Sequence, residues 1–184
     1  MNLQELLPLI DFAINDCERI IQNNPQAVLS ESDFERLLSE CISKQIGYDV
    51  EAPAPDRYSV HTQVSHYKNE TRILDARVDI LIAKPDDIKP EVSINKNFEI
   101  YAPSDSVALE LKYKKNNKGG LSDIKKDIDK FTKYKNDSYY YAIVLLNPSK
   151  HVNRRERNIL KYFNAKRNEL SGKDRFFCRI IVKK

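Results

Sequence analysis

Two aliphatic segments of this chain each carry charged side chains at positions that a sheet strand would bury. Residues 77–82 read Arg-Val-Asp-Ile-Leu-Ile, and residues 107–113 read Val-Ala-Leu-Glu-Leu-Lys-Tyr. Short segments that are aliphatic on both faces are typical of central strands in a sheet. Because side chains alternate across a strand, Glu110 and Lys112 project from the same face. The two segments therefore predict a sheet with charged groups near its centre.

Charged side chains in such strands need partners. An unpaired carboxylate or ammonium would be strongly destabilising there, so Asp79, Glu110 and Lys112 each require a counter-charge or a metal ion. Two carboxylates and a lysine that converge on one sheet face form an oxygen-ligand site for a hard divalent ion. The alternative interpretation is a structural salt-bridge network on edge strands, in which the two carboxylates pair with Lys112 and Arg77. Lys112 also has the simpler alternative of a structural pair with Glu110.

The apolar patterns predict one domain that combines helices with a sheet. A length of 184 residues suits a single core. The elements follow the order α-α-β-β-β-α-β-α-β, which predicts an α/β (α+β) fold with a central mixed β-sheet flanked by helices. The expected helices cover residues 2–23, 32–46, 121–131 and 152–170, and the expected strands cover 59–67, 77–82, 107–113, 139–146 and 176–182. Between the two charged strands, residues 84–106 form an insertion that contains a small hairpin.

The start of the second helix carries two candidate acidic residues. Ser32-Asp33-Phe34-Glu35 reads as a capping box, so the helix is expected to begin at Ser32. A capping role alone would account for Glu35. Glu31 lies about one turn earlier and is the alternative acid of this helix.

The formal net charge of +4 is the difference between two oppositely charged parts of the chain. Residues 1–111 carry 10 basic and 20 acidic side chains, whereas residues 112–184 carry 21 basic and 7 acidic ones. A basic part that begins at the candidate site indicates a polyanionic partner, and we expect nucleic acid. The alternative is a lysine-rich surface that only keeps the protein in solution.

The order of these features matches a known pattern. A helix glutamate, a strand aspartate, Glu-x-Lys on the next strand, and then a helix and a strand resemble the PD-(D/E)XK nuclease superfamily, the restriction-endonuclease-like fold. The resemblance covers roughly residues 30–147, and residues 32–38 followed by Gly47-Tyr48 are similar to the opening helix of restriction and resolvase-like members. Val78 stands where the family pattern has proline, and the long separation of Asp79 from Glu110 is attributed to the insertion.

The resemblance implies a metal-dependent endonuclease that hydrolyses phosphodiester bonds in DNA, in defence, restriction or repair. Asp79 and Glu110 would hold one or two Mg²⁺ (or Mn²⁺) ions, together with the backbone carbonyl of Leu111 and waters. Lys112 would position or help deprotonate the attacking water. Glu35 would orient the metal shell or ligate the metal through water.

The same resemblance implies a division of the chain into three segments. Residues 1–30 would be an N-terminal helical extension, residues 31–147 the nuclease core with its insertion at 84–106, and residues 148–184 a basic C-terminal helix and strand. Alternative functions are an RNA-cleaving, toxin-type nuclease of the same fold and a non-catalytic nucleic-acid-binding or scaffold subunit. A homodimer and a subunit of a larger complex both stay open.

Basic side chains after the Glu-x-Lys strand are the expected contacts to phosphate groups, with DNA favoured over RNA as the partner. Such contacts bind without reading sequence and make affinity depend strongly on salt. They are Lys114, Lys115, Lys118, Lys125, Lys126, Lys130, Lys133, Arg154, Arg155 and Arg157.

The remaining sequence features concern the cellular compartment and the classes of site that the chain can contain. Cys17 and Cys41 fall on apolar helix faces, so we expect buried, reduced thiols and a cytoplasmic protein. We expect no membrane association, because no run approaches the apolar length of a membrane span and the first residues lack the basic start of a secretory signal. The histidines show no zinc spacing, and nucleotide-binding and hydrolase-elbow motifs are missing from the sequence.

Overall fold

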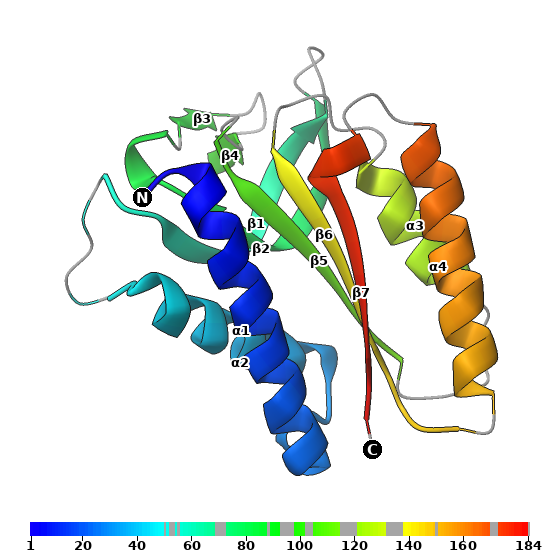
Figure 1. Ribbon diagram of the computed structural model, residues 1–184. Coiled ribbons are helices and arrows are strands. Elements are labelled where there is room, and N and C mark those ends of the chain that lie inside the picture. Colours follow the sequence, from blue (N-terminus) through cyan, green and yellow to red (C-terminus); the bar gives the residue numbers. More distant parts are fainter. Residues whose placement is uncertain are drawn as a thin grey trace.

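The two charged segments form neighbouring interior strands of one sheet. A computed structural model of the protein shows β2 (Ile73–Ala83) next to β5 (Val107–Lys114) in a five-stranded sheet of order β1-β2-β5-β6-β7 (Figure 1). The edges are β1 (Ser59–Lys68) and β7 (Phe176–Val182). The interpretation that placed the charges on edge strands is therefore wrong. The structure describes residues 1–49, 51, 54, 56–68, 73–87, 89–92, 98–101, 105–114, 121–131, 138–149, 151–169 and 173–183.

The sheet is mixed, as predicted. β1 pairs antiparallel with β2, and β2 pairs antiparallel with β5. β5 then runs parallel to β6 (Tyr139–Leu146), and β6 runs parallel to β7. Parallel neighbours need crossover connections, and helices α3 (Ser122–Phe131) and α4 (Val152–Asn168) provide them.

Helices cover both faces of the sheet, which gives three layers (Figure 1). α1 (Leu3–Asn23) and α2 (Glu31–Ile46) pack on one face, over a core that includes Ile80, Leu109 and Leu111. α3 and α4 pack on the other face, over a second core that includes Ala108 and Ala142. Because β5 lies between two apolar layers, its side chains are buried on both faces, and this accounts for its continuous aliphatic sequence.

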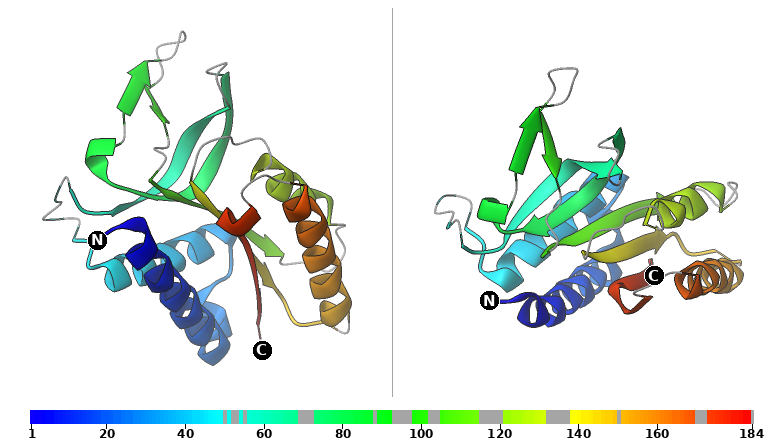
Figure 2. Two further views of the ribbon diagram at one scale, coloured as in Figure 1. Left: turned by 45° about the horizontal axis from the view of Figure 1, so that its top comes forward. Right: turned by 90° about the horizontal axis from the view of Figure 1, so that it is seen from above.

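The insertion between β2 and β5 forms a separate two-stranded antiparallel sheet of β3 (Lys89–Val92) and β4 (Phe98–Tyr101). Figure 2 shows this hairpin projecting from the molecule, and its β4 strand contacts β1 of the main sheet. The predicted hairpin is confirmed, and the residues of its turn lie outside the described part of the chain. Short 3₁₀ turns occupy Pro25–Ala27, Pro85–Asp87 and Lys173–Arg175.

The second helix begins earlier than predicted. Its cap is Ser30, whose Oγ accepts a hydrogen bond from the Asp33 backbone N–H at 3.1 Å, while the Asp33 carboxylate accepts from the Ser30 N–H at 2.9 Å. The capping box predicted at Ser32–Glu35 is wrong because an equivalent pair two residues earlier takes the role. Glu35 is thereby left available for another contact. Gly47 ends the helix in the left-handed conformation, as expected.

The two cysteines of the N-terminal helices can also be compared with the prediction. Cys17 and Cys41 are both buried with free thiols, which confirms the prediction for these two residues. Within the described residues, no helix has the length and apolar character needed to cross a membrane.

The position of the α2 cap leads to a stability prediction. Ser30→Ala removes the acceptor for the Asp33 N–H and is expected to lower the free energy of unfolding by about 1 kcal/mol. Ser32→Ala, at an exposed helical position, is expected to change it by less than about 0.5 kcal/mol. Urea unfolding of both variants measures the difference. Equal losses, or a larger loss for Ser32→Ala, would contradict the Ser30 cap.

Candidate active site

β2 and β5 separate near the middle of the sheet, and Asp79 lies where they part. Their paired register ends at Ile80 opposite Leu109. The next hydrogen-bonded position of β5 would be Leu111, but its N–H donates instead to the Asp79 carboxylate, at 2.6 Å. In an extended strand the N–H and C=O of one residue point to the same side, so the Leu111 carbonyl also faces this gap. The gap therefore holds a carboxylate and a backbone carbonyl.

Burial makes the ionised form of the Asp79 side chain unfavourable relative to the protonated form. Desolvation raises its pKa above 3.8, and the neighbouring carboxylates of Glu31 and Glu35 raise it further. The Leu111 N–H and the Lys112 ammonium act in the opposite direction but do not cancel the rise. A bound cation would offset both the burial and the like charges.

Glu110 and Lys112 lie on the opposite sheet face from the Leu111 side chain and border α3. Both line a small space together with Ile124 and Asp127 of α3. Glu110 is 5 % exposed, which confirms that a carboxylate is buried in the centre of the sheet. The Glu-x-Lys spacing therefore places both charged groups on one face, as predicted.

Two carboxylates hold the ammonium of Lys112. Its Nζ lies 3.2 Å from Oε1 of Glu31 and 3.3 Å from Oδ2 of Asp127. Burial lowers the pKa of Lys112, but the attraction of Asp127 and Glu31 outweighs burial and leaves that pKa above 10.5. Lys112 is therefore a fixed positive charge at neutral pH rather than a base.

Both candidate acids of α2 reach the site, by different routes. Glu31 accepts from the backbone N–H of Tyr113 at 3.0 Å as well as from Lys112. Glu35 accepts a 2.8 Å hydrogen bond from the side-chain amide of Gln63, and the same nitrogen lies 3.4 Å from Oδ1 of Asp79. Glu31 is thus the acid at β5, and Glu35 is linked to Asp79 through Gln63.

The donor set suits a hard divalent ion. Asp79, Glu110 and the Leu111 carbonyl supply oxygen atoms, and Mg²⁺ is commonly held by one or two carboxylates while it keeps several waters. Within the described residues, no group of three or more His, Cys, Asp or Glu side chains forms a ready-made cage.

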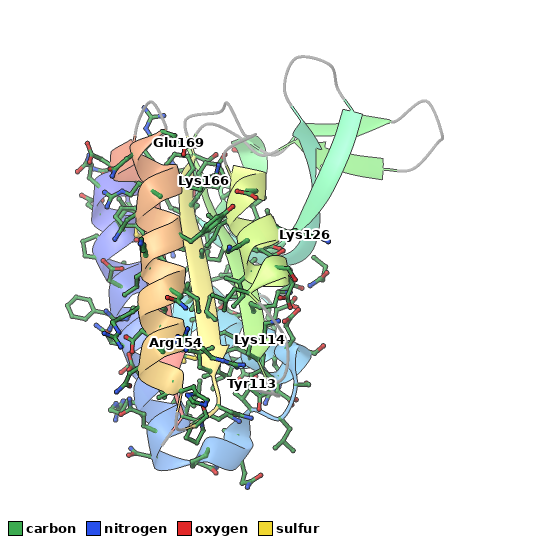
Figure 3. The ribbon with its side chains drawn as sticks, turned by 90° about the vertical axis from the view of Figure 1, so that its right-hand side faces the viewer. Tyr113, Lys114, Lys126, Arg154, Lys166 and Glu169 are labelled. Atoms are coloured by element: carbon green, nitrogen blue, oxygen red, sulfur yellow. The ribbon has the colours of Figure 1, made fainter. Side chains whose placement is uncertain are left out.

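The predicted phosphate contacts are distributed over α3 and α4. Lys126, Arg154 and Arg157 are exposed, as is Lys125, whose ammonium lies over the Tyr162 ring, and Arg155 is half-buried. Figure 3 shows Lys126 and Arg154 on the side of the molecule formed by these two helices. Lys114 instead forms a salt bridge with Asp123. Lys115, Lys118, Lys133 and the side chain of Lys130 lie outside the described part of the chain.

Sequence reasoning missed two side chains of this site. Asp127 carried a usable signal, because it lies three residues after Ile124 and next to Ile128, on the face of α3 expected to be apolar. Gln63 carried none, since a glutamine in a strand is ordinary. Its contacts depend on the pairing of β1 with β2 and on the packing of α2.

The described side-chain contact of His61 lies within its own strand. His61 Nε2 is 2.6 Å from the Oγ of Ser59, on the same strand. The side chain of His66 lies outside the described residues.

Comparison with known proteins adds no relative. No family model, curated protein or solved structure matches this chain. The functional interpretation therefore depends on the residues and the geometry of the chain itself.

The burial of Asp79 leads to a pH-dependent stability prediction. Because its folded-state pKa is raised, the folded protein binds more protons than the unfolded chain between that pKa and the unfolded value near 3.9. The stability contributed by this group therefore falls as pH rises from about 4 through the folded-state pKa. Asp79→Asn keeps an acceptor for the Leu111 N–H and is expected to remove this fall.

The stability of Asp79→Asn relative to the wild type should thus increase between about pH 4 and pH 7. Urea unfolding at several pH values in the presence of EDTA measures this, with Asp105→Asn, an exposed aspartate, as the matched control. A difference between Asp79→Asn and the wild type that stays constant with pH would be inconsistent with a raised Asp79 pKa.

Proposed function

We propose that this protein is a metal-dependent nuclease that hydrolyses phosphodiester bonds in DNA. The observation that carries the proposal is the position of Asp79. Its carboxylate accepts a hydrogen bond from the backbone N–H of Leu111. Leu111 lies in β5 between the buried Glu110 and Lys112, whose ammonium is paired with Glu31. Strands that part at two acidic positions next to a lysine match the PD-(D/E)XK pattern that the sequence resembles.

The metal would be held by Asp79, Glu110 and the Leu111 carbonyl, with Glu35 acting through water or through Gln63. When bound, Mg²⁺ supplies polarisation of the phosphate and lowers the pKa of a water molecule. The protein supplies a partly dehydrated site, in which attraction to a cation is stronger than in bulk water. The raised pKa of Asp79 is consistent with a carboxylate that gains from such an ion.

Lys112 would act as a positive charge. Its ammonium is held by Glu31 and Asp127, so it stays protonated at neutral pH. A protonated lysine offsets negative charge that develops on the phosphate and orients the attacking water through its N–H donors. Of the two roles predicted for Lys112, this geometry favours positioning over deprotonation of the water.

The exposed cations on α3 and α4 would bind the nucleic-acid backbone. These helices cover the sheet face on which Glu110 and Lys112 lie. α4 carries Arg154, Arg155, Arg157, Lys161, Lys166 and Arg167 against one acidic residue, Glu156. A basic helix on the same face as the candidate site would guide a polyanion toward it.

The preference for DNA, and a role in defence, restriction or repair, follow from the resemblance. A cytoplasmic setting is proposed because Cys17 and Cys41 have free, buried thiols. RNA cleavage and binding without cleavage are alternative outcomes of the experiment below.

The central prediction concerns cleavage. The purified protein is expected to cut DNA with Mg²⁺ or Mn²⁺ and not with EDTA. Asp79→Asn, Glu110→Gln and Lys112→Met are each expected to lower the single-turnover rate at least ~100-fold, because each removes a charge from the reacting region. Gel assays on single-stranded DNA, duplex DNA and structured RNA measure the rates and identify the substrate class.

Two exposed residues away from the site serve as matched controls, Asp105→Asn and Lys44→Met, and they should cleave at the wild-type rate. Circular dichroism checks that each variant is folded. Wild-type protein that binds DNA but cuts no substrate with either metal would contradict the nuclease proposal and favour a binding subunit.

A second prediction concerns affinity and salt. Arg154→Ala and Arg157→Ala combined are expected to weaken DNA binding and to reduce the slope of log K against log [salt] by about 1 to 2. Arg19→Ala, at an exposed position of α1 on the opposite face of the sheet, is the control and should keep the wild-type slope. Fluorescence anisotropy at several salt concentrations measures both quantities. An unchanged slope in the double variant would exclude α4 as the DNA-binding surface.

A further inference from the structure

Gln63 is the one described non-glycine residue with a positive φ, 53°. It lies inside β1, where extended backbone is expected, and a side chain in the left-handed region is strained. The register of β1 and β2 pairs Thr62 with Ile80 and Val64 with Val78, so the distorted residue faces Asp79 across the two strands. The distortion is thus located at the candidate site.

The core packing shows the same interruption in β2. Ile80 and Ile82 belong to the core under α1 and α2, whereas Val78 belongs to the core under α3 and α4. In a regular strand, residues two apart share a face. The alternation of β2 side chains between the two cores therefore breaks at Asp79, opposite the distorted Gln63 of β1.

The side chain of Gln63 makes a bridge at this point. Its amide nitrogen donates to Oε2 of Glu35 at 2.8 Å and lies 3.4 Å from Oδ1 of Asp79. Two carboxylates repel each other. An amide NH₂ group that donates to both can hold them close together without adding a charge to the site. Glu35 is available for this contact because the α2 cap is formed by Ser30 and Asp33.

We propose that Gln63 is a positioning residue, which holds Glu35 beside Asp79 for a divalent metal ion and keeps its strained backbone for that purpose. This inference rests on the proposed function of the site. The alternative is that the distortion is only a structural irregularity of a long, twisted hairpin, with the amide contacts a by-product.

The test measures Mn²⁺ binding to the full chain by titration calorimetry, without substrate. Gln63→Met keeps the length of the side chain and removes the amide. Gln63→Gly removes the amide and also relieves the left-handed strain. Both variants are expected to bind Mn²⁺ about 10- to 100-fold more weakly, as is usual when a residue that orients a metal ligand is lost.

Thermal unfolding with EDTA supplies an independent readout. Gln63→Gly is expected to melt at or above the wild-type temperature and above Gln63→Met, because glycine adopts the positive φ without strain. Gln45→Met is the matched control. It removes a 2.8 Å glutamine–aspartate hydrogen bond to Asp16, far from the site, and should leave Mn²⁺ affinity unchanged.

The outcomes separate this inference from the proposed function. Weaker Mn²⁺ binding by both Gln63 variants, with a folded and stable Gln63→Gly, supports it. Mn²⁺ binding within about twofold of wild type in both variants, but lost in Asp79→Asn, would overturn the role of Gln63 and leave the metal site in place. Absence of Mn²⁺ binding by the wild type would overturn both.

Discussion

Two carboxylates take the place of a missing strand along one edge of β5. Beyond Leu109, β2 no longer pairs with β5, and the backbone N–H groups of alternate residues would be left in a partly buried gap. Asp79 accepts from Leu111, and Glu31 accepts from Tyr113. Buried backbone donors without partners are costly, so the separation of the strands depends on these acidic side chains. Structure and candidate chemistry thus use the same groups.

This arrangement concentrates negative charge. Glu31, Glu35 and Asp79 lie at the gap, and the ammonium of Lys112 attracts Glu31 and Asp79. Asp127 draws the same ammonium from the α3 side, so the lysine is shared between two layers of the molecule. Burial and like charge raise the pKa of Asp79, and the carboxylate gives up part of its solvation to remain in the gap. A site in this condition gains more from a divalent cation than an exposed carboxylate pair would.

The strand patterns of the sequence predict the centre of the sheet correctly. The aliphatic runs around Asp79 and Glu110 predicted two interior strands, and the alternation within Glu-x-Lys predicted a shared face. The α2 cap was misplaced because Ser30–Asp33 and Ser32–Glu35 both fit a capping box, and local sequence does not decide between them. Contacts such as Gln63 with Glu35 depend on how a hairpin and a helix pack, which is set by long-range pairing and not by local spacing.

β5 can serve both fold and site because its two edges are different. On one edge, every residue from Val107 to Lys114 is paired in parallel register with β6, which anchors the strand in the core. On the other edge, three residues pair with β2, and the backbone beyond them is open to side chains. A rigid strand with one open edge fixes the Leu111 carbonyl and its acidic neighbours without relying on a loop. The strain at Gln63 lies on β1, an edge strand whose one neighbour in the sheet is β2, and edges are where sheets commonly carry such irregularities.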